Sequence, residues 1–257
     1  MNKSLLTACG ALLLFTATAC TSHYRLANTT RTRMVIDQRY DVHPDPAAAD
    51  FLVPYKQKVD SVMGPAVGTV AHDMAATRPE SNLSNLLSDI LVWASQDYGE
   101  HPVLGVYNMG GIRAALSKGK VTYGDVLAVA PFENKICFLT LSGEKLLELF
   151  SQMAARGGEG VSHGTELVIS SSGKLVSARL HGQPIDPKAS YRIATIDYLS
   201  QGNDGMTAFK AGTDLVSPSE EQNNTRYIII NYFKEKTAQG VAVSAQVEGR
   251  IVVKDMP

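Results

Sequence analysis

The stretch 103-VLGVYNMGGIRAALSKGKVTYGDVLAVAPF-132 contains a strand that ends in a polar motif. Residues 103–107 are mostly apolar and predict the strand, and the letters NMGGIR follow it without a spacer. Gly110 and Gly111 would allow a tight turn and a close approach of the backbone to a ligand. Their N–H groups can also form a nest that binds an anion.

Two polar side chains flank these glycines. Arg113 can reach the same anion with its planar fork of donors. Asn108 carries both a donor and an acceptor, as recognition of an amide or a heterocycle edge requires. Taken alone, the motif is equally compatible with a turning loop that carries a solvent-exposed arginine.

The composition fits a soluble globular protein with one large domain or two small ones. The chain has 257 residues, of which 44% are hydrophobic and 19% are charged. Its formal net charge is −1, from 24 Lys and Arg against 25 Asp and Glu. Because a nucleic-acid polymer is bound by a strongly basic surface, this balance disfavours such a partner.

The N-terminus predicts export. Lys3 is followed by an apolar run, Leu5 to Ala19, which is too short to span a membrane comfortably. Small residues before Cys20 resemble a bacterial lipoprotein cleavage site, although Ala17 stands where Leu is commonest. We therefore expect a lipoprotein signal peptide at 1–19, a lipidated Cys20 and a flexible tether at 20–32.

Such a chain would be lipid-anchored to a bacterial membrane, on the periplasmic side or at the cell surface. The alternative is an ordinary secreted protein cut near Ala19. Cys137 lies in an apolar run and is expected in the core, so the cysteines do not predict a disulfide framework.

Helices and strands occur without strict alternation, which predicts an α+β domain over residues 33–254. The expected helices are 47–62, 81–96, 142–156 and 220–235. The expected strands are 34–36, 66–71, 103–107, 166–169, 175–180, 191–196 and 249–253. Asp45 is a possible cap of the first helix, and Ser81 or Asn82 of the second.

Three further positions can carry binding chemistry, each with a plainer alternative. Asp204, in the loop Gly-Asn-Asp-Gly, could accept hydrogen bonds from vicinal hydroxyls or form an Asx turn. Phe132, after Pro131, is either a ring at a cleft or a core residue. Arg78, just ahead of a helix, could hold an anion or simply be solvated.

In their order along the chain, these motifs resemble the C-terminal domain of the 5′-nucleotidase family. The resemblance covers about residues 33–254 and implies a layered α/β/β/α domain with two mixed sheets. The family's Asn-Gly-Gly-Gly-Ile-Arg is similar to residues 108–113 here. Met109 and Asn203 stand where the family has Gly, and Tyr198 stands where Phe is more usual.

The resemblance implies a nucleotide- or nucleoside-binding site. Its eight expected residues are Arg78, Asn108, Gly110, Gly111, Arg113, Phe132, Tyr198 and Asp204. The two aromatic rings would sandwich the base, the amide would bond the base edge, and the aspartate would accept the ribose hydroxyls. The two arginines would bind phosphate or a nearby carboxylate.

The family's catalytic machinery is not expected in this chain. That chemistry belongs to a separate N-terminal metallophosphatase domain, which holds two metal ions through Asp-x-His, Gly-Asn-His and further His ligands. Gly-Asn-His does not occur here, the single Asp-x-His is Asp41-Val42-His43, and neither it nor the adjacent pair His72-Asp73 supplies enough ligands for a metal site. The residues before Ser81 are too few for such a domain. We therefore expect no catalytic residue, metal or cofactor in this chain, and divalent metals only on a partner phosphatase.

The sequence leaves two main functional hypotheses. The chain is either the nucleotide-binding part of a split 5′-nucleotidase in nucleotide catabolism, completed by a metallophosphatase chain, or a stand-alone nucleotide- or nucleoside-binding lipoprotein. A third, weaker alternative is a structural domain that has lost its ligand. The base preference, and the choice among mononucleotide, nucleotide sugar and nucleoside, stay open.

Overall fold

The computed structural model describes residues 24–43 and 45–254. The predicted signal peptide and Cys20 lie outside these residues. The chain divides into two units, one ending at Phe51 and one beginning at Leu52. The predicted strand at 34–36 is wrong: these residues have no regular structure, and Met34 and Ile36 are 78% and 89% exposed. A short apolar run without a pairing partner has nothing to hold it as a strand.

The first described helical elements are η1 (Gln38–Tyr40) and α2 (Pro46–Met63), and α2 spans the boundary between the two units. The Asp45 carboxylate accepts hydrogen bonds from the backbone N–H groups of Ala47 and Ala48, at 2.9 and 3.3 Å, as expected of a cap. In the part of the chain that the structure describes, no helix combines the length and apolar character needed to cross a bilayer.

The larger sheet has five strands. In spatial order they are β10 (Thr213–Val216), β4 (Ile136–Ser142), β9 (Ser190–Ile196), β2 (Leu104–Tyr107) and β5 (Gly160–Val161). β9 and β2 are parallel, whereas the other neighbouring pairs are antiparallel, so the sheet is mixed. Cys137 on β4 is buried, as predicted, and burial raises the pKa of its thiol to about 11.

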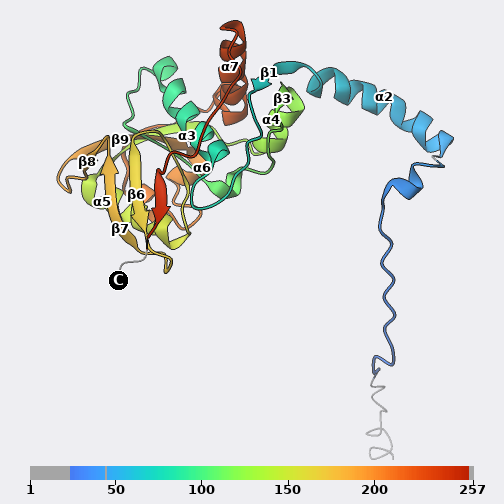
Figure 1. Cartoon of the computed structure of the whole chain (residues 1–257), viewed down its shortest axis with the longest axis horizontal. Helices are drawn as coiled ribbons and strands as arrows, with labels where there is room; N and C mark the ends of the chain where they lie inside the picture. The colour runs from blue at the N-terminus through green and yellow to red at the C-terminus, as the bar shows by residue number, and fades with distance from the viewer. Residues whose placement is uncertain (1–23, 44, 255–257) are drawn as a thin grey trace, which may run out of the picture. The chain divides into compact units, whose positions relative to one another are not determined.

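The second sheet has four strands and is also mixed. Its order is β11 (Ile251–Val253), β6 (Thr165–Ile169), β7 (Leu175–Leu180) and β8 (Gln183–Pro184), with β11 parallel to β6 and the other pairs antiparallel. β6, β7 and β11 lie side by side in Figure 1. A short antiparallel pair, β1 (Ala66–Val70) and β3 (Gly119–Thr122), forms a sheet of its own. The prediction of an α+β fold with two mixed sheets is confirmed.

The principal helices begin at side-chain caps. α3 (Asn82–Ala94) begins after Ser81, whose Oγ accepts a hydrogen bond from the backbone N–H of Ser84 at 3.2 Å. The apolar residues Leu83, Leu86, Leu87, Ile90, Leu91 and Ala94 of α3 recur at helical spacing and are buried, and α3 packs against β2 and β5. α5 (Gly143–Ala155) begins after Ser142 and contacts β4 of the larger sheet and β7 of the smaller one.

The remaining helices are short, apart from α7. They are η2 (Ser95–Tyr98), η3 (Met109–Gly111), α4 (Tyr123–Val129), α6 (Asp197–Ser200), η4 (Thr207–Ala211), η5 (Glu221–Asn223) and α7 (Thr225–Ala238). The prediction that the last helix begins at Glu220 is wrong, because the side chain of Asn224 caps α7 through the N–H of Arg226. The last strand begins at Ile251, not at Gly249, whose φ of +81° lies far from strand values.

Candidate functional site

Strand pairing brings three distant segments to one edge of the larger sheet. β2 and β9 are parallel neighbours, so the residues after Tyr107 and after Ile196 leave the sheet at the same edge. β4 runs antiparallel to β9, and Ile136 at its start pairs with Ile196. The segment just before β4 therefore reaches this edge as well.

A cavity of about 330 Å³ lies among these segments. It is lined by Asn108, Gly110, Arg113, Phe132, Asn134, Tyr198 and Asp204. Six of the eight predicted site residues line it, while Arg78 and Gly111 do not. Phe132 is 46% exposed and Tyr198 is 38% exposed, so neither ring belongs to the core. Both aromatic rings are therefore accessible to a ligand in the cavity.

Asp204 is held by a side chain from the segment after β2 and by one from its own segment after β9. Its Oδ2 accepts a hydrogen bond from Asn108 Nδ2 at 2.6 Å, and its Oδ1 accepts one from the Tyr198 hydroxyl at 3.1 Å. Gly202 and Gly205 have positive φ, as Asp204 itself does at +54°, so the loop turns tightly. The Asp204 hydrogen bond raises the pKa of the Tyr198 hydroxyl, because the carboxylate favours the neutral phenol.

The two motif glycines have different tasks. Asn108 is 4% exposed, and its Oδ1 is buried beside Gly111 without a hydrogen-bond partner among the described residues. A Cβ on Gly111 would lie 2.5 Å from that oxygen, so Gly111 makes room for the amide. Gly110 faces the cavity, where an added Cβ would lie 3.5 Å from Asp204 Oδ2.

Because a carboxylate only accepts hydrogen bonds, the Asp204 contact fixes which end of the Asn108 amide is the NH₂ group. In this structure the amide therefore supports Asp204. The predicted contact between Asn108 and a base edge stays a prediction.

The structure explains how Met109 is accommodated where the family has glycine. Its side chain is 7% exposed and belongs to the hydrophobic core, so it does not obstruct the cavity. Its backbone N–H donates a hydrogen bond to Glu159 Oε2 at 2.6 Å. The motif backbone is thereby tied to a buried acid that the sequence did not single out.

Glu159 also binds two arginines. Its side chain is 0% exposed, and its Oε1 accepts hydrogen bonds from Arg78 Nη2 at 2.5 Å and from Arg156 Nε at 2.7 Å. Arg78 therefore meets a carboxylate, one of the two partners expected for it, at a position that does not line the cavity. Arg156 Nη2 also lies 4.0 Å from Asp204 Oδ2. The hydrogen bond to Glu159 raises the pKa of Arg156.

Arg113 supplies the guanidinium that lines the cavity. Its Nη1 lies 3.4 Å from the carbonyl oxygen of Gly110, at the long end of a hydrogen bond. Its backbone N–H donates to the carbonyl oxygen of Val129 at 2.9 Å, which anchors the backbone two residues after η3.

The sequence-based prediction missed three residues, which are Asn134, Arg156 and Glu159. Asn134 lines the cavity, and the other two form the ion pair beside it. Arg156 was interpreted only as the end of a helix, and Glu159 follows two glycines in a segment without a periodic pattern. Neither belongs to a motif that would have marked it.

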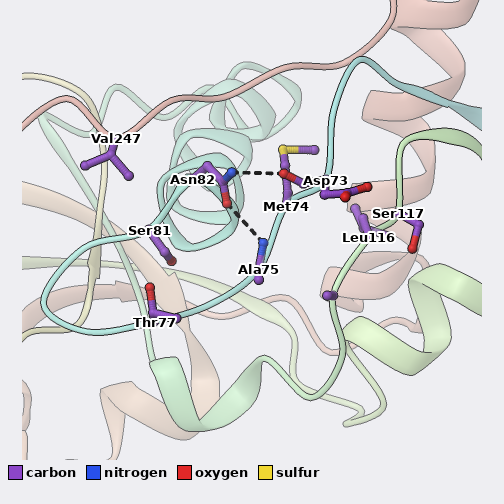
Figure 2. Close-up of a pocket in the computed structure, with 10 residues that line it drawn as sticks. Asp73, Met74, Ala75, Thr77, Ser81, Asn82, Leu116, Ser117 and Val247 are labelled. Carbon is purple, nitrogen blue, oxygen red and sulfur yellow. Dashed lines mark hydrogen bonds between the residues drawn. The ribbon is translucent and has the colours of Figure 1, made fainter.

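A second cavity, of about 420 Å³, lies beside the segment that precedes Arg78 (Figure 2). Asn82 accepts a hydrogen bond from the N–H of Ala75 at 3.0 Å and donates one to the carbonyl oxygen of Asp73 at 3.2 Å. These bonds hold the segment against the start of α3. None of the eight predicted site residues lines this cavity.

His72 and Asp73, which are adjacent in the sequence, do not converge on a position that a metal ion could occupy. His72 Nδ1 lies 3.0 Å from the backbone oxygen of Asp73, whose carboxylate instead accepts a hydrogen bond from the N–H of Lys118. Within residues 24–43 and 45–254, no three His, Cys, Asp or Glu side chains are grouped so that they could hold a metal ion.

The fold is that of a known class of domain. Residues 66–211 match the family model described as 5′-nucleotidase, C-terminal domain. The chain belongs to this family.

Individual proteins of this kind are similar to the chain over much of its length. Protein UshA of Yersinia enterocolitica is 25% identical over 234 residues, which are 89% of this chain and 41% of that protein. An apyrase of Tabanus yao is 28% identical over 197 residues, or 67% of this chain and 34% of that one. The structure of a 5′-nucleotidase precursor from Thermus thermophilus superposes with a TM-score of 0.70 and 28% identity, covering 83% of this chain and 44% of that one. The chain thus spans less than half the length of each of these relatives.

Proposed function

We propose that this chain binds the nucleotide in a 5′-nucleotidase-type hydrolase system of nucleotide catabolism. One observation carries the proposal: Phe132 and Tyr198 line a single cavity with Asn108, Arg113 and Asp204. Two exposed ring faces suit a nucleobase, and stacking of this kind contributes roughly 1–3 kcal/mol per base. A pre-oriented carboxylate suits the vicinal hydroxyls of a ribose.

Hydrolysis is proposed to need a metallophosphatase on a separate chain. The matched region accounts for 41% of the Yersinia relative and 44% of the Thermus structure. The rest of those proteins offers room for the metal-dependent domain that the family resemblance implies. The partner's metals would activate the attacking water, while this chain would hold the base and the sugar.

Binding is tested by calorimetry on the purified full chain with AMP, UMP and adenosine. We expect saturable binding, and Phe132→Ala and Tyr198→Ala should each weaken it by about 5- to 150-fold, the equivalent of roughly 1–3 kcal/mol of stacking. The matched control is Tyr191→Ala, because Tyr191 is a half-buried ring on β9 that does not line the cavity. No heat at millimolar concentrations of any of the three ligands would refute the proposed function.

The partner is tested by reconstitution. Nucleotide hydrolysis should appear when a metallophosphatase chain that lacks its own C-terminal domain is mixed with this chain, and not with either chain alone. Binding without hydrolysis in every such mixture would instead favour a stand-alone nucleotide- or nucleoside-binding lipoprotein. Robust turnover by this chain alone, after removal of host phosphatases, would contradict the proposed division of labour.

We also propose export and lipid anchoring at Cys20. One relative, from Listeria monocytogenes, is named a cell wall protein and is 27% identical over 225 residues. Cys20→Ser should move the chain from the membrane fraction to the soluble fraction of the producing cells. Mass spectrometry of the wild-type N-terminus should find a diacylglyceryl cysteine, and an unmodified residue there would contradict the anchor.

A further inference from the structure

Glu159 neutralises positive charge beside the cavity. Its two oxygens accept three hydrogen bonds, from Arg78, from Arg156 and from the backbone N–H of Met109. Guanidinium and amide groups only donate, so this environment is built for an ionised carboxylate. Because the Glu159 side chain is 0% exposed, water screens these contacts poorly.

The charges in and beside the cavity leave a surplus of one positive charge, because three arginines stand against the two acids Asp204 and Glu159. The residues that line the cavity include one cation, Arg113, and one anion, Asp204. Arg156 lies 4.0 Å from Asp204 in addition to its bond to Glu159, so two carboxylates already face its guanidinium. Arg78 is paired with the same buried acid. A phosphate dianion would therefore meet little surplus positive charge.

We infer that Glu159 makes this pocket select the nucleoside part of its ligand, so that a 5′-phosphate adds little affinity. The inference rests on the proposed function and concerns the same site. Base stacking on Phe132 and Tyr198 and sugar contacts at Asp204 are unaffected by this charge balance. The phosphate gains chiefly from Arg113, an exposed group whose ion pair raises affinity by up to about fivefold.

The test compares adenosine with AMP by calorimetry on the full chain. In the wild type, the two dissociation constants should agree within about fivefold. Glu159→Gln keeps the size of the side chain but removes its charge, so the positive charge of Arg78 and Arg156 beside the cavity is no longer offset by Glu159. The preference for AMP over adenosine should then rise by about tenfold, the effect of one good charge-assisted contact.

Glu148→Gln is the matched control, because Glu148 pairs with Lys145 on α5 and does not line the cavity. It should leave the AMP-to-adenosine ratio at the wild-type value. The ratio is the readout because a partly unfolded sample lowers the binding of both ligands equally. Circular dichroism of each variant checks the fold independently.

A wild-type preference for AMP of more than about twentyfold would overturn the inference while leaving the proposed function intact. An unchanged ratio in folded Glu159→Gln would do the same. If that variant does not fold, the wild-type ratio measured at about 50 mM and about 300 mM salt decides, since a phosphate held by surplus positive charge loses affinity as salt rises. A steep fall in the ratio contradicts the inference, and a flat ratio supports it. Binding of neither ligand refutes the proposed function and the inference together.

Discussion

Gly110→Ala and Gly111→Ala should differ sharply in their effect on stability, although the two residues are adjacent. A Cβ on Gly111 would lie 2.5 Å from Asn108 Oδ1 and 3.2 Å from Tyr107 Cε1. The Asn108 amide would have to move, and its 2.6 Å hydrogen bond to Asp204 would lengthen or break. The nearest atom to a Cβ on Gly110 is Asp204 Oδ2 at 3.5 Å, an ordinary contact.

The magnitudes follow from these distances. Overpacking costs about 1–3 kcal/mol, and loss of a hydrogen bond to a charged group costs about 1.5–3 kcal/mol. Since relaxation relieves part of each, we expect Gly111→Ala to lower the free energy of unfolding by about 2 kcal/mol, or the melting temperature by about 4–8 °C. Gly110→Ala should change stability by less than about 0.5 kcal/mol.

The two variants should also differ in how their effects on binding and on stability are related. Gly110→Ala places a methyl group in the cavity and should weaken adenosine binding in a fully stable protein. Gly111→Ala should weaken both, because Asp204 loses the amide that orients it. Thermal and urea unfolding followed by circular dichroism, with calorimetry below the transition, measure both effects. Equal melting temperatures for the two variants would refute the roles assigned to Asn108 and Gly111.

Two further predictions concern ion pairs away from the cavity. The side chain of Arg250 is 4% exposed and lies 2.8 Å from the Asp89 carboxylate. Arg250→Met should therefore lower the free energy of unfolding in urea by about 3 kcal/mol, whereas Lys145→Met, in an exposed pair, should lower it by less than about 1 kcal/mol. Equal losses in the two variants would contradict this prediction. The hydrogen bond from Arg192 lowers the pKa of Glu100. A lowered pKa gives stability that is present above the unfolded value of about 4.3 and lost as pH falls. Glu100→Gln should thus flatten the acid side of the stability–pH curve. Parallel curves for the wild type and the variant would show that the Arg192–Glu100 ion pair does not contribute to stability.

Much of the fold was predictable because its elements have strong local signals. The apolar spacing of residues 83–94 and the Ser81 cap identify α3 to within a few residues. The strand at 34–36 was wrong because three apolar residues say nothing about whether a neighbouring strand exists. The predicted start of α7 was wrong because the cap is Asn224, and several polar residues before it are also of types that cap helices.

Part of the cavity lining was predictable, because its residues belong to motifs. They were predicted because their order along the chain resembles that of a known family, and six of the eight predicted residues line one cavity. The resemblance could not predict which side chains form hydrogen bonds with each other at the site. Asn108 bonds Asp204, and Arg78 bonds Glu159. Such contacts depend on which loops the sheet brings together, which single motifs do not encode.

Glu159 shows why that information is absent from local sequence. It stands directly before β5, a strand of two residues that is too short to give a periodic pattern. β5 pairs antiparallel with β2, and the register places Gly160 opposite Tyr107. Continuing that register by one residue sets Glu159 opposite Asn108, at the start of the motif.

The buried acid therefore reaches the site through the register of a very short strand. Its bond to the N–H of Met109 fixes the motif backbone, while its bonds to Arg78 and Arg156 set the charge of the surroundings. A substitution at this one position should consequently alter ligand preference, although Glu159 itself does not line the cavity. The pairing of β5 with β2 thus places Glu159 beside the candidate site and thereby sets the charge there. The AMP-to-adenosine ratio is the measurement that tests this effect.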